Sequence, residues 1–314
     1  MSRRRARGRE VRADGAALRA FLGELIDHAP LFPPAQLPIP EALAAHERAE
    51  SGTYFWMLGR FVVAASRLNE LVAALERDDA PGPLPVSIVL DGEPGRTLAV
   101  VTALASAHAA RIDVEALESA APLEAVSQAY ESADLPREPE LYVELDATDR
   151  IELEAALLGL NRYREASERD VGAKVRCGGV SADAVPTPAQ LAGFIALANA
   201  LGVPYKATAG LHHPVRHFNA EAGYVQHGFL NLAGAAVLAR AHGLDERALE
   251  TLLADEDASD FKLDGERFSW CGVTAHAGEI GAARLRGLRS YGSCSFDEPV
   301  ADLLGLGMLS AAAQ

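Results

Sequence analysis

Short apolar runs alternate with longer amphipathic segments along most of the chain. The runs with strand character lie at 59–64, 85–91, 111–117, 140–146, 172–177, 204–210, 268–272 and 289–295. Segments with the apolar spacing of helices lie between and after them, at 66–77, 97–109, 123–133, 150–163, 188–201, 225–242, 246–254, 275–286 and 299–306. Strands that alternate with helices form βαβ units and a parallel sheet. Eight such units predict an α/β fold, a (β/α)8 barrel of the TIM type.

An open, doubly wound sheet is the rival arrangement. It would usually contain fewer units or divide into two halves, and its dinucleotide-binding form carries G-x-G-x-x-G in the first βα turn. That motif is absent from the first turn here. The alternation therefore favours the closed barrel.

The first part of the chain does not follow this rhythm. Residues 1–14 are rich in arginine, and we expect a disordered basic arm, with a partner- or nucleic-acid-binding arm as the alternative. Residues 15–52 predict a helical and Pro-rich extension, with helices at 16–28 and 41–50. This extension would cap the bottom of the barrel or embrace a partner subunit in a homodimer. The barrel domain itself is expected at 53–314.

Composition narrows the class of protein. The formal net charge of −15 disfavours a nucleic-acid partner, although a local positive pocket could still bind a small anion. The three cysteines form no C-x-x-C pair, which fits a reducing cytoplasm. No apolar run approaches the roughly 20 residues of a membrane span, so we expect no membrane contact.

Alternation within each strand predicts which side chains fill the barrel lumen. The inward set is Ser87, Asp91, Asp113, Glu115, Tyr142, Glu144, Asp146, Lys174, Arg176, Lys206 and Thr208, while the strand with Ser293 and Ser295 has no clear phase. Carboxylates on the second to fourth strands would thus face cations on the fifth and sixth. Buried charges are costly unless paired, and proteins keep such clusters most often for chemistry. A salt-bridged structural plug is the alternative.

Lys206 is the leading catalytic candidate. Lys174 and Arg176 on the neighbouring strand would lower the pKa of its amine, and a neutral amine can form a Schiff base with a carbonyl compound. Glu144 or Tyr142 would then move protons. A structural ion pair with Glu144 or Asp146, and simple anion binding, remain alternatives for Lys206.

The segment Lys206-Ala-Thr-Ala-Gly210 resembles the Lys-Thr-Ser-Thr-Gly signature of deoxyribose-phosphate aldolase. The resemblance covers about ten residues and implies a Schiff-base lysine at Lys206, on the sixth strand, as in class I aldolase barrels. Other class I barrels carry a lysine or glutamate on the fourth and fifth strands, parts that Glu144 and Lys174 would take. The second lysine of the aldolase finds no match on the seventh strand here.

Four histidines follow Lys206 closely: His212, His213, His217 and His227. They could bind a divalent metal together with Glu144, Asp146 or Asp91. They could instead supply acid and base groups above the lysine, with His212 and His213 as candidates. A purely structural role in the loop is the third possibility.

Several further residues are candidate substrate contacts. Arg176 and Arg216 would bind an anionic group, and Asp91, Asp146, Thr208, Ser293 and Ser295 lie at strand ends, where barrel active sites form. The first hypothesis is therefore a lyase that acts on a small anionic carbonyl compound and needs no cofactor. A metal-dependent hydrolase, isomerase or lyase is the second, and a non-catalytic binding or scaffold barrel is the third.

Overall fold

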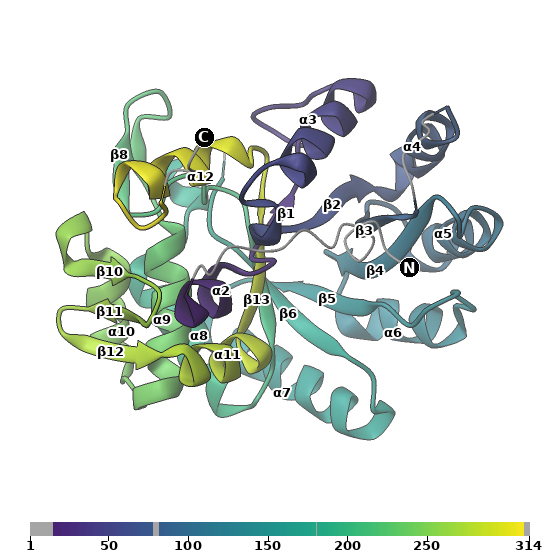
Figure 1. Cartoon of the computed structure of the whole chain (residues 1–314). Coiled ribbons are helices and arrows are strands. Elements are labelled where there is room, and N and C mark those ends of the chain that lie inside the picture. The colour runs from purple at the N-terminus through teal and green to yellow at the C-terminus, as the bar shows by residue number, and fades with distance from the viewer. Residues whose placement is uncertain (1–14, 78–81, 180, 311–314) are drawn as a thin grey trace.

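A closed parallel barrel forms the centre of the molecule, as predicted (Figure 1). The computed structural model describes residues 15–77, 82–179 and 181–310, so the expected basic arm at 1–14 lies outside the described residues. The barrel strands follow the order β1-β13-β7-β6-β5-β4-β3-β2. They are β1 (Ile26–His28), β2 (Leu58–Ala64), β3 (Leu84–Leu90), β4 (Ile112–Ser119), β5 (Glu140–Leu145), β6 (Val171–Arg176), β7 (Tyr205–Thr208) and β13 (Leu288–Ser293).

Helices surround this barrel and bury its outer apolar face (Figure 1). They are α2 (Ala16–Leu22), α3 (Ile39–Ser51), α4 (Leu68–Leu75), α5 (Pro94–Ala107), α6 (Leu123–Ser132), α7 (Arg150–Ser167), α8 (Pro188–Ala200), α9 (Phe229–His242), α10 (Glu246–Ala254), α11 (Ala277–Arg286) and α12 (Asp297–Gly305). None of the helices in the described residues is both long and apolar enough to cross a bilayer.

The eighth barrel strand comes from the N-terminal segment, which differs from the prediction. β1 pairs with both β13 and β2 and so closes the barrel. The helix expected at 16–28 ends at Leu22, because Gly23 caps it and Glu24 takes a positive φ of 48°. The boundary expected at residue 53 is therefore wrong, since residues before it complete the sheet. β1 has three residues, all buried, and thus offers no polar–apolar alternation to read.

The run expected as the seventh barrel strand, 268–272, lies outside the barrel. It belongs to an antiparallel sheet of β10 (Phe261–Leu263), β11 (Arg267–Trp270) and β12 (Val273–His276). Phe268 stacks on Phe21 of α2 with ring centroids 4.5 Å apart, which explains its apolar character. Counted from β1, the strand that carries Lys206 is the seventh of the barrel, not the sixth as expected.

A bulge in β4 changes the phase of that strand. Val86 of β3 pairs with Val114, but the next residue, Ser87, pairs with Ala116, which leaves Glu115 as the extra residue. After the bulge, Ala116 and Glu118 continue the inward face. Asp113 and Glu115 lie before this shift, at the N-terminal end of the barrel, where they pair with Arg137 and Arg60 rather than with the lysines of its centre.

The upper end of the barrel in Figure 1 is its C-terminal end, where the strands lead into their following loops. The long connection from β7 to α9 forms a small antiparallel hairpin there, β8 (His217–Asn219) and β9 (Tyr224–Gln226). α3 and α12 also cover this end (Figure 1).

Candidate active site

An ion-paired cluster fills the middle of the barrel around Lys206. Its Nζ lies 2.8 Å from Asp27 Oδ2 and 2.5 Å from Glu118 Oε1, and its side chain is 1% exposed. The hydroxyl of Ser290 donates to Asp27 at 2.7 Å, and that of Ser87 donates to Glu118 at 2.6 Å. Two carboxylates therefore hold the amine of Lys206 in the interior of the barrel.

The protonation state of Lys206 is the opposite of the expected one. Burial alone would lower the pKa of the amine, but the charges of Asp27 and Glu118 outweigh it and raise the pKa above its ordinary value. Burial alone would raise the pKa of each carboxyl, yet Lys206 brings both below their usual range. All three groups are charged at neutral pH. The expected lowering of the Lys206 pKa is wrong because these carboxylates contact the amine directly.

The cluster continues to the C-terminal ends of β5 and β6. Lys174 lies opposite Lys206 in the strand register, and its Nζ is 3.1 Å from Glu118 Oε2 and 2.9 Å from Glu144 Oε2. Arg176 binds Glu144 Oε1 at 3.1 Å and is 53% exposed, whereas Glu144 is 20% exposed. Burial alone would raise the pKa of Glu144, but Lys174 and Arg176 bring it below its ordinary value.

Four of the predicted residues thus share one cluster: Lys206, Lys174, Glu144 and Arg176. Their roles in a reaction stay predictions. Tyr142 lies beside them, with Lys206 Nζ 5.6 Å from its ring centroid, and its hydroxyl donates to Glu140 at 2.8 Å. Burial, followed by the charge of Glu140, raises the pKa of Tyr142 well above its ordinary value. The phenol therefore stays protonated and is a poor proton acceptor.

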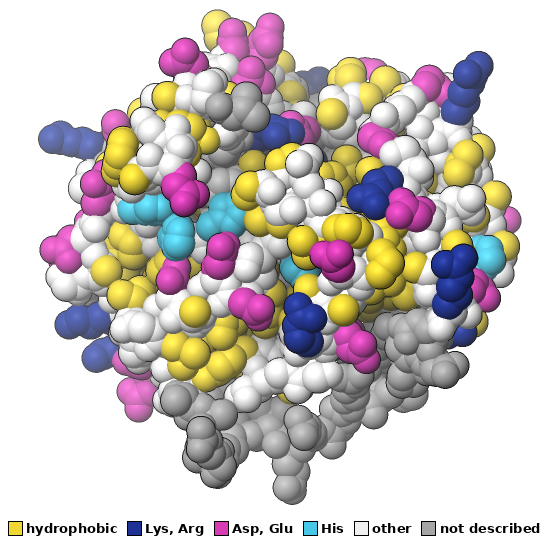
Figure 2. Space-filling view, turned by 90° about the horizontal axis from the view of Figure 1, so that it is seen from above, with side chains coloured by type: hydrophobic (Ala, Val, Ile, Leu, Met, Phe, Trp, Pro, Cys, Tyr) yellow, Lys and Arg dark blue, Asp and Glu magenta, His cyan; other side chains and the backbone are white. Residues whose placement is uncertain are grey.

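His212 and His213 lie on the loop after β7 and face α12. His212 Nδ1 is 3.2 Å from Glu298 Oε2, and His213 Nδ1 is 2.7 Å from Asp302 Oδ2. These two carboxylates share one face of α12, since they are four residues apart. Cys294 Sγ lies 3.8 Å from the same nitrogen of His212. Figure 2 shows histidine side chains gathered on this upper face.

The later histidines of the loop point to separate partners. His217 Nδ1 lies 3.1 Å from the carbonyl of Val215. His227 is buried, its Nε2 lies 2.7 Å from the carbonyl of Pro186, and burial lowers its pKa to about 4. Arg216 bonds to His227 Nδ1 at 3.4 Å rather than to the lysine cluster. These contacts are those of a packed loop.

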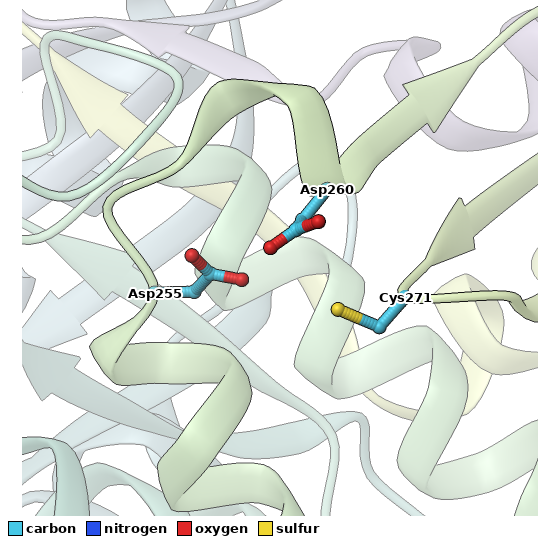
Figure 3. Close-up of side chains that lie close together, drawn as sticks. All are labelled: Asp255, Asp260 and Cys271. Atoms are coloured by element: carbon cyan, nitrogen blue, oxygen red, sulfur yellow. The ribbon is translucent and has the colours of Figure 1, made fainter.

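The histidine metal site, one of three alternatives for this loop, is not among the possible metal-ligand groups of the described residues. There, the group that brings three ligand atoms within 4.8 Å of one another is Asp255, Asp260 and Cys271. Figure 3 shows their side chains turned toward one another at the edge of the β10–β12 sheet. Trp270 Nε1 already donates to Asp255 at 2.7 Å. This group is remote from the predicted ligands in sequence and contains no histidine.

Asp91 and Asp146 do not join the inward cluster, although both were expected there. Asp91 is exposed and accepts bonds from the backbone and the hydroxyl of Ser66, at 3.0 and 2.5 Å. Asp146 is exposed beyond the end of β5 and accepts from the backbone N–H of Thr148 at 2.8 Å. Each carboxylate therefore stabilises its own loop.

The serines at and just beyond the end of β13 also serve the local backbone. Ser293 Oγ donates to the carbonyl of Ser295 at 2.7 Å, and Ser295 Oγ accepts from the backbone N–H of Glu298 at 3.2 Å. Thr208 lies opposite Arg176 and Gly292 in the register, next to the candidate site. Of these three predicted contacts, Thr208 is the one beside the lysine cluster.

Sequence reasoning missed both carboxylates that hold Lys206. Asp27 lies in the short β1, inside a segment whose apolar spacing resembles a helix. Glu118 lies one residue beyond the expected end of its strand at 117. A second buried pair was also missed: His28 and His46 face each other with their Nδ1 atoms 3.2 Å apart. A charged residue at the end of an apolar run was the available signal for Glu118.

Comparison with known proteins places the chain in no established family. No protein family model matches it, and no curated protein does. Among solved structures it is similar to a lysine/ornithine decarboxylase from Vibrio vulnificus in complex with cadaverine. The match has 16% sequence identity and a TM-score of 0.39, covers 61% of this chain, and spans 48% of the decarboxylase chain.

Proposed function

We propose that this chain is a lyase that acts on a small anionic carbonyl compound at the C-terminal end of the barrel. The observation that supports this is an unbroken series of ion pairs that runs from an exposed guanidinium to a buried amine. It consists of Arg176, Glu144, Lys174, Glu118 and Lys206. Enzymes with this barrel build their active sites at these strand ends.

Each outer member of the series has a chemical role in the proposal. Arg176 binds the carboxylate or phosphate of the substrate, since a guanidinium matches both bidentately. Lys174 donates a hydrogen bond to the carbonyl oxygen, and Glu144 removes the proton on the neighbouring carbon. When the substrate shares Arg176, Glu144 loses part of the positive field that lowers its pKa. The carboxylate is then a stronger base with substrate bound than without.

A covalent form of the proposal uses Lys206. Its ammonium group would pass a proton to Glu118 or Asp27, and the amine would attack the carbonyl carbon and lose water to form an imine. His212 or His213 would assist proton transfer from the loop above. The raised pKa and the burial of Lys206 work against this route, because the resting amine is protonated and enclosed.

Proton exchange tests the acid–base step directly. The protein is incubated in D2O with a panel of small phosphorylated and carboxylated aldehydes and ketones, and loss of the proton signal beside the carbonyl is followed by NMR. Glu144→Gln should slow exchange at least about a hundredfold. Arg176→Gln should raise KM more than it lowers kcat. Asp146→Asn, at an exposed carboxyl beyond the same strand, is the matched control and should keep full activity.

Two results would overturn the proposal: a wild-type protein that exchanges no member of the panel, or equal losses in Glu144→Gln and Asp146→Asn. Borohydride trapping with an active substrate then separates the two forms. A reduced adduct on Lys206 supports the imine, whereas turnover without an adduct supports acid–base chemistry alone. Labelling confined to Lys262, which is exposed on β10, indicates a nonspecific adduct.

A non-catalytic binding or scaffold barrel is the second candidate, and the enclosed state of Lys206 favours it. An amine that is 1% exposed and paired with two carboxylates fits a structural plug. In that case the Glu144 and Lys174 variants would change the free energy of unfolding while no panel compound reacted.

A further inference from the structure

A cavity of about 200 Å³ lies outside the barrel lumen, between the strand β5 and the helices α6 and α7 (Figure 1). Most of its wall is apolar, with side chains such as Val143 of β5, Leu123 of α6 and Leu153 of α7. It reaches the C-terminal end of the barrel, because its wall includes Pro122 after β4 and Asp146 after β5. Voids of this size are few in the packed interior of a domain.

Gly159 keeps this cavity wide. It lies on the wall and in the interior of α7, where glycine weakens a helix relative to alanine. A Cβ added at Gly159 would meet no atom within 4 Å, so no close neighbour requires a glycine there. A larger residue would improve the helix but fill the space beside Leu153 and Leu160. The glycine thus leaves room for a ligand at a cost to the helix.

The wall carries negative charge without a lysine or arginine among its described residues. Its carboxylates are those of Glu124, Glu144, Asp146 and Glu152. Glu144 is neutralised by Lys174 and Arg176 on the lumen side. The other three are exposed and form no ion pair with any described residue.

The starts of the two helices offset only part of this charge. Glu124 lies in the first turn of α6, and Glu152 lies in the first turn of α7. A helix start carries a partial charge of about +0.5, so the two starts together offset about one of the three free carboxylates. Asp146 accepts the backbone N–H of Thr148, which orients its carboxylate without neutralising it. An excess of negative charge therefore remains at the mouth of an apolar cavity.

We propose that this cavity binds an amphipathic cation, an aliphatic amine. Its chain would lie against the apolar wall, and its ammonium group would face Glu124, Asp146 and Glu152. An ammonium group has three donors and no acceptor, which matches a rim of carboxylates. An apolar pocket with a few convergent polar groups is the usual form of a small-molecule site. The cavity lies on the outer side of β5, so the inference does not rest on the proposed lyase reaction.

Three ligands with the same chain and different charge test the proposal: n-hexylamine, 1-hexanol and hexanoate. Binding to the full chain is measured by calorimetry at pH 7.5, where the amine is protonated. Hexylamine should bind saturably at one site, and hexanol should bind about threefold to tenfold more weakly, with hexanoate weaker still. From butylamine to hexylamine the affinity should rise about fourfold with each methylene group, because each is buried.

Two substitutions locate the ligand. Gly159→Leu should keep the melting temperature at or above that of wild type and weaken hexylamine binding at least about tenfold, because the leucine occupies the chain's place. Gly281→Leu is the matched control, since a Cβ at this helical glycine of α11 also meets open space. Glu152→Gln should weaken hexylamine binding about twofold to fivefold and leave hexanol binding unchanged. Glu154→Gln, an exposed position of α7 outside the wall, should bind both like wild type.

Several results would overturn the proposal. Absence of saturable hexylamine binding removes the site, and a folded Gly159→Leu with wild-type affinity places the ligand elsewhere. Equal affinities for hexylamine and hexanol, or tighter binding of hexanoate, show that the cavity does not select a cation. If Gly159→Leu does not fold, the comparison of Glu152→Gln with Glu154→Gln decides, and equal affinities in these two variants reject the site.

Discussion

Replacing Lys206 by methionine tests how much the central cluster contributes to stability. The substitution keeps the approximate length of the side chain but removes two charged hydrogen bonds, of 2.8 Å to Asp27 and 2.5 Å to Glu118. A hydrogen bond to a charged group contributes about 1.5–3 kcal/mol, and breaking a buried ion pair costs about 3–5 kcal/mol. Asp27 keeps Ser290, and Glu118 keeps Lys174, so the loss should not exceed the range for a broken buried ion pair.

We therefore expect Lys206→Met to lower the free energy of unfolding by about 3–5 kcal/mol at pH 7.5. This loss is a large part of the free energy of unfolding of an ordinary domain, which is roughly 5–15 kcal/mol. Urea unfolding followed by circular dichroism measures the change. Lys262→Met, on an exposed strand position, is the control and should stay within about 0.5 kcal/mol of wild type.

A second substitution tests whether an unpaired carboxylate causes the loss of stability in Lys206→Met. If the loss comes from an unpaired carboxylate, adding Asp27→Asn to Lys206→Met should recover part of the stability, because the pair then couples strongly. A Lys206→Met loss below about 1 kcal/mol, or additive losses in the double variant, would refute the reasoning.

Two further outcomes follow from other buried positions. Burial, and secondarily nearby arginines, lower the pKa values of His28 and His227 from 6.5 to about 4. Below pH 6.5 the unfolded chain therefore binds more protons than the folded one. The contribution of each imidazole to the free energy of unfolding is fully present above pH 6.5 and falls by about 3 kcal/mol toward pH 4. Equal urea midpoints at pH 7.5 and 5 would contradict this. Gly172→Ala would place a Cβ 2.5 Å from the Pro204 carbonyl and should lower the melting temperature clearly, whereas Gly281→Ala, with open space around it, should not.

The barrel could be predicted because most of its short apolar strands alternate with helices, in which apolar residues recur at a different spacing. The helices that follow β3 and β5 bury one apolar stripe each, and the strands β3, β5 and β6 stay near the predicted bounds. β1 could not be predicted in the same way. Its three residues are all buried, and two of them, Asp27 and His28, are polar, so neither hydropathy nor alternation marks a strand.

Part of the candidate site could be predicted, because regular strand alternation places some of its residues and a bulge hides others. Lys174, Lys206 and Glu144 lie on strands without a bulge between them, so the period of two residues placed them correctly on the inner face. Glu118 lies after the bulge at Glu115, where that period fails. Sequence alone therefore showed the cations of the lumen but not the carboxylates that hold Lys206. The pKa direction of Lys206 depended on those missing partners.

The charge balance of the completed cluster bears on the proposed reaction. Arg176, Lys174 and Lys206 face Glu144, Glu118 and Asp27, so its cations and carboxylates cancel. An anionic substrate adds a negative charge to this balanced set, and a poorly hydrated site resists such an addition. The added negative charge raises the proton affinity of the nearby carboxylates, above all of one that the substrate can reach. That carboxylate is Glu144, which is 20% exposed and shares both of its cations with the position proposed for the substrate. Glu144 would therefore enter the reaction ionised, with a raised proton affinity, and take its proton from the substrate carbon, as the proposed base requires.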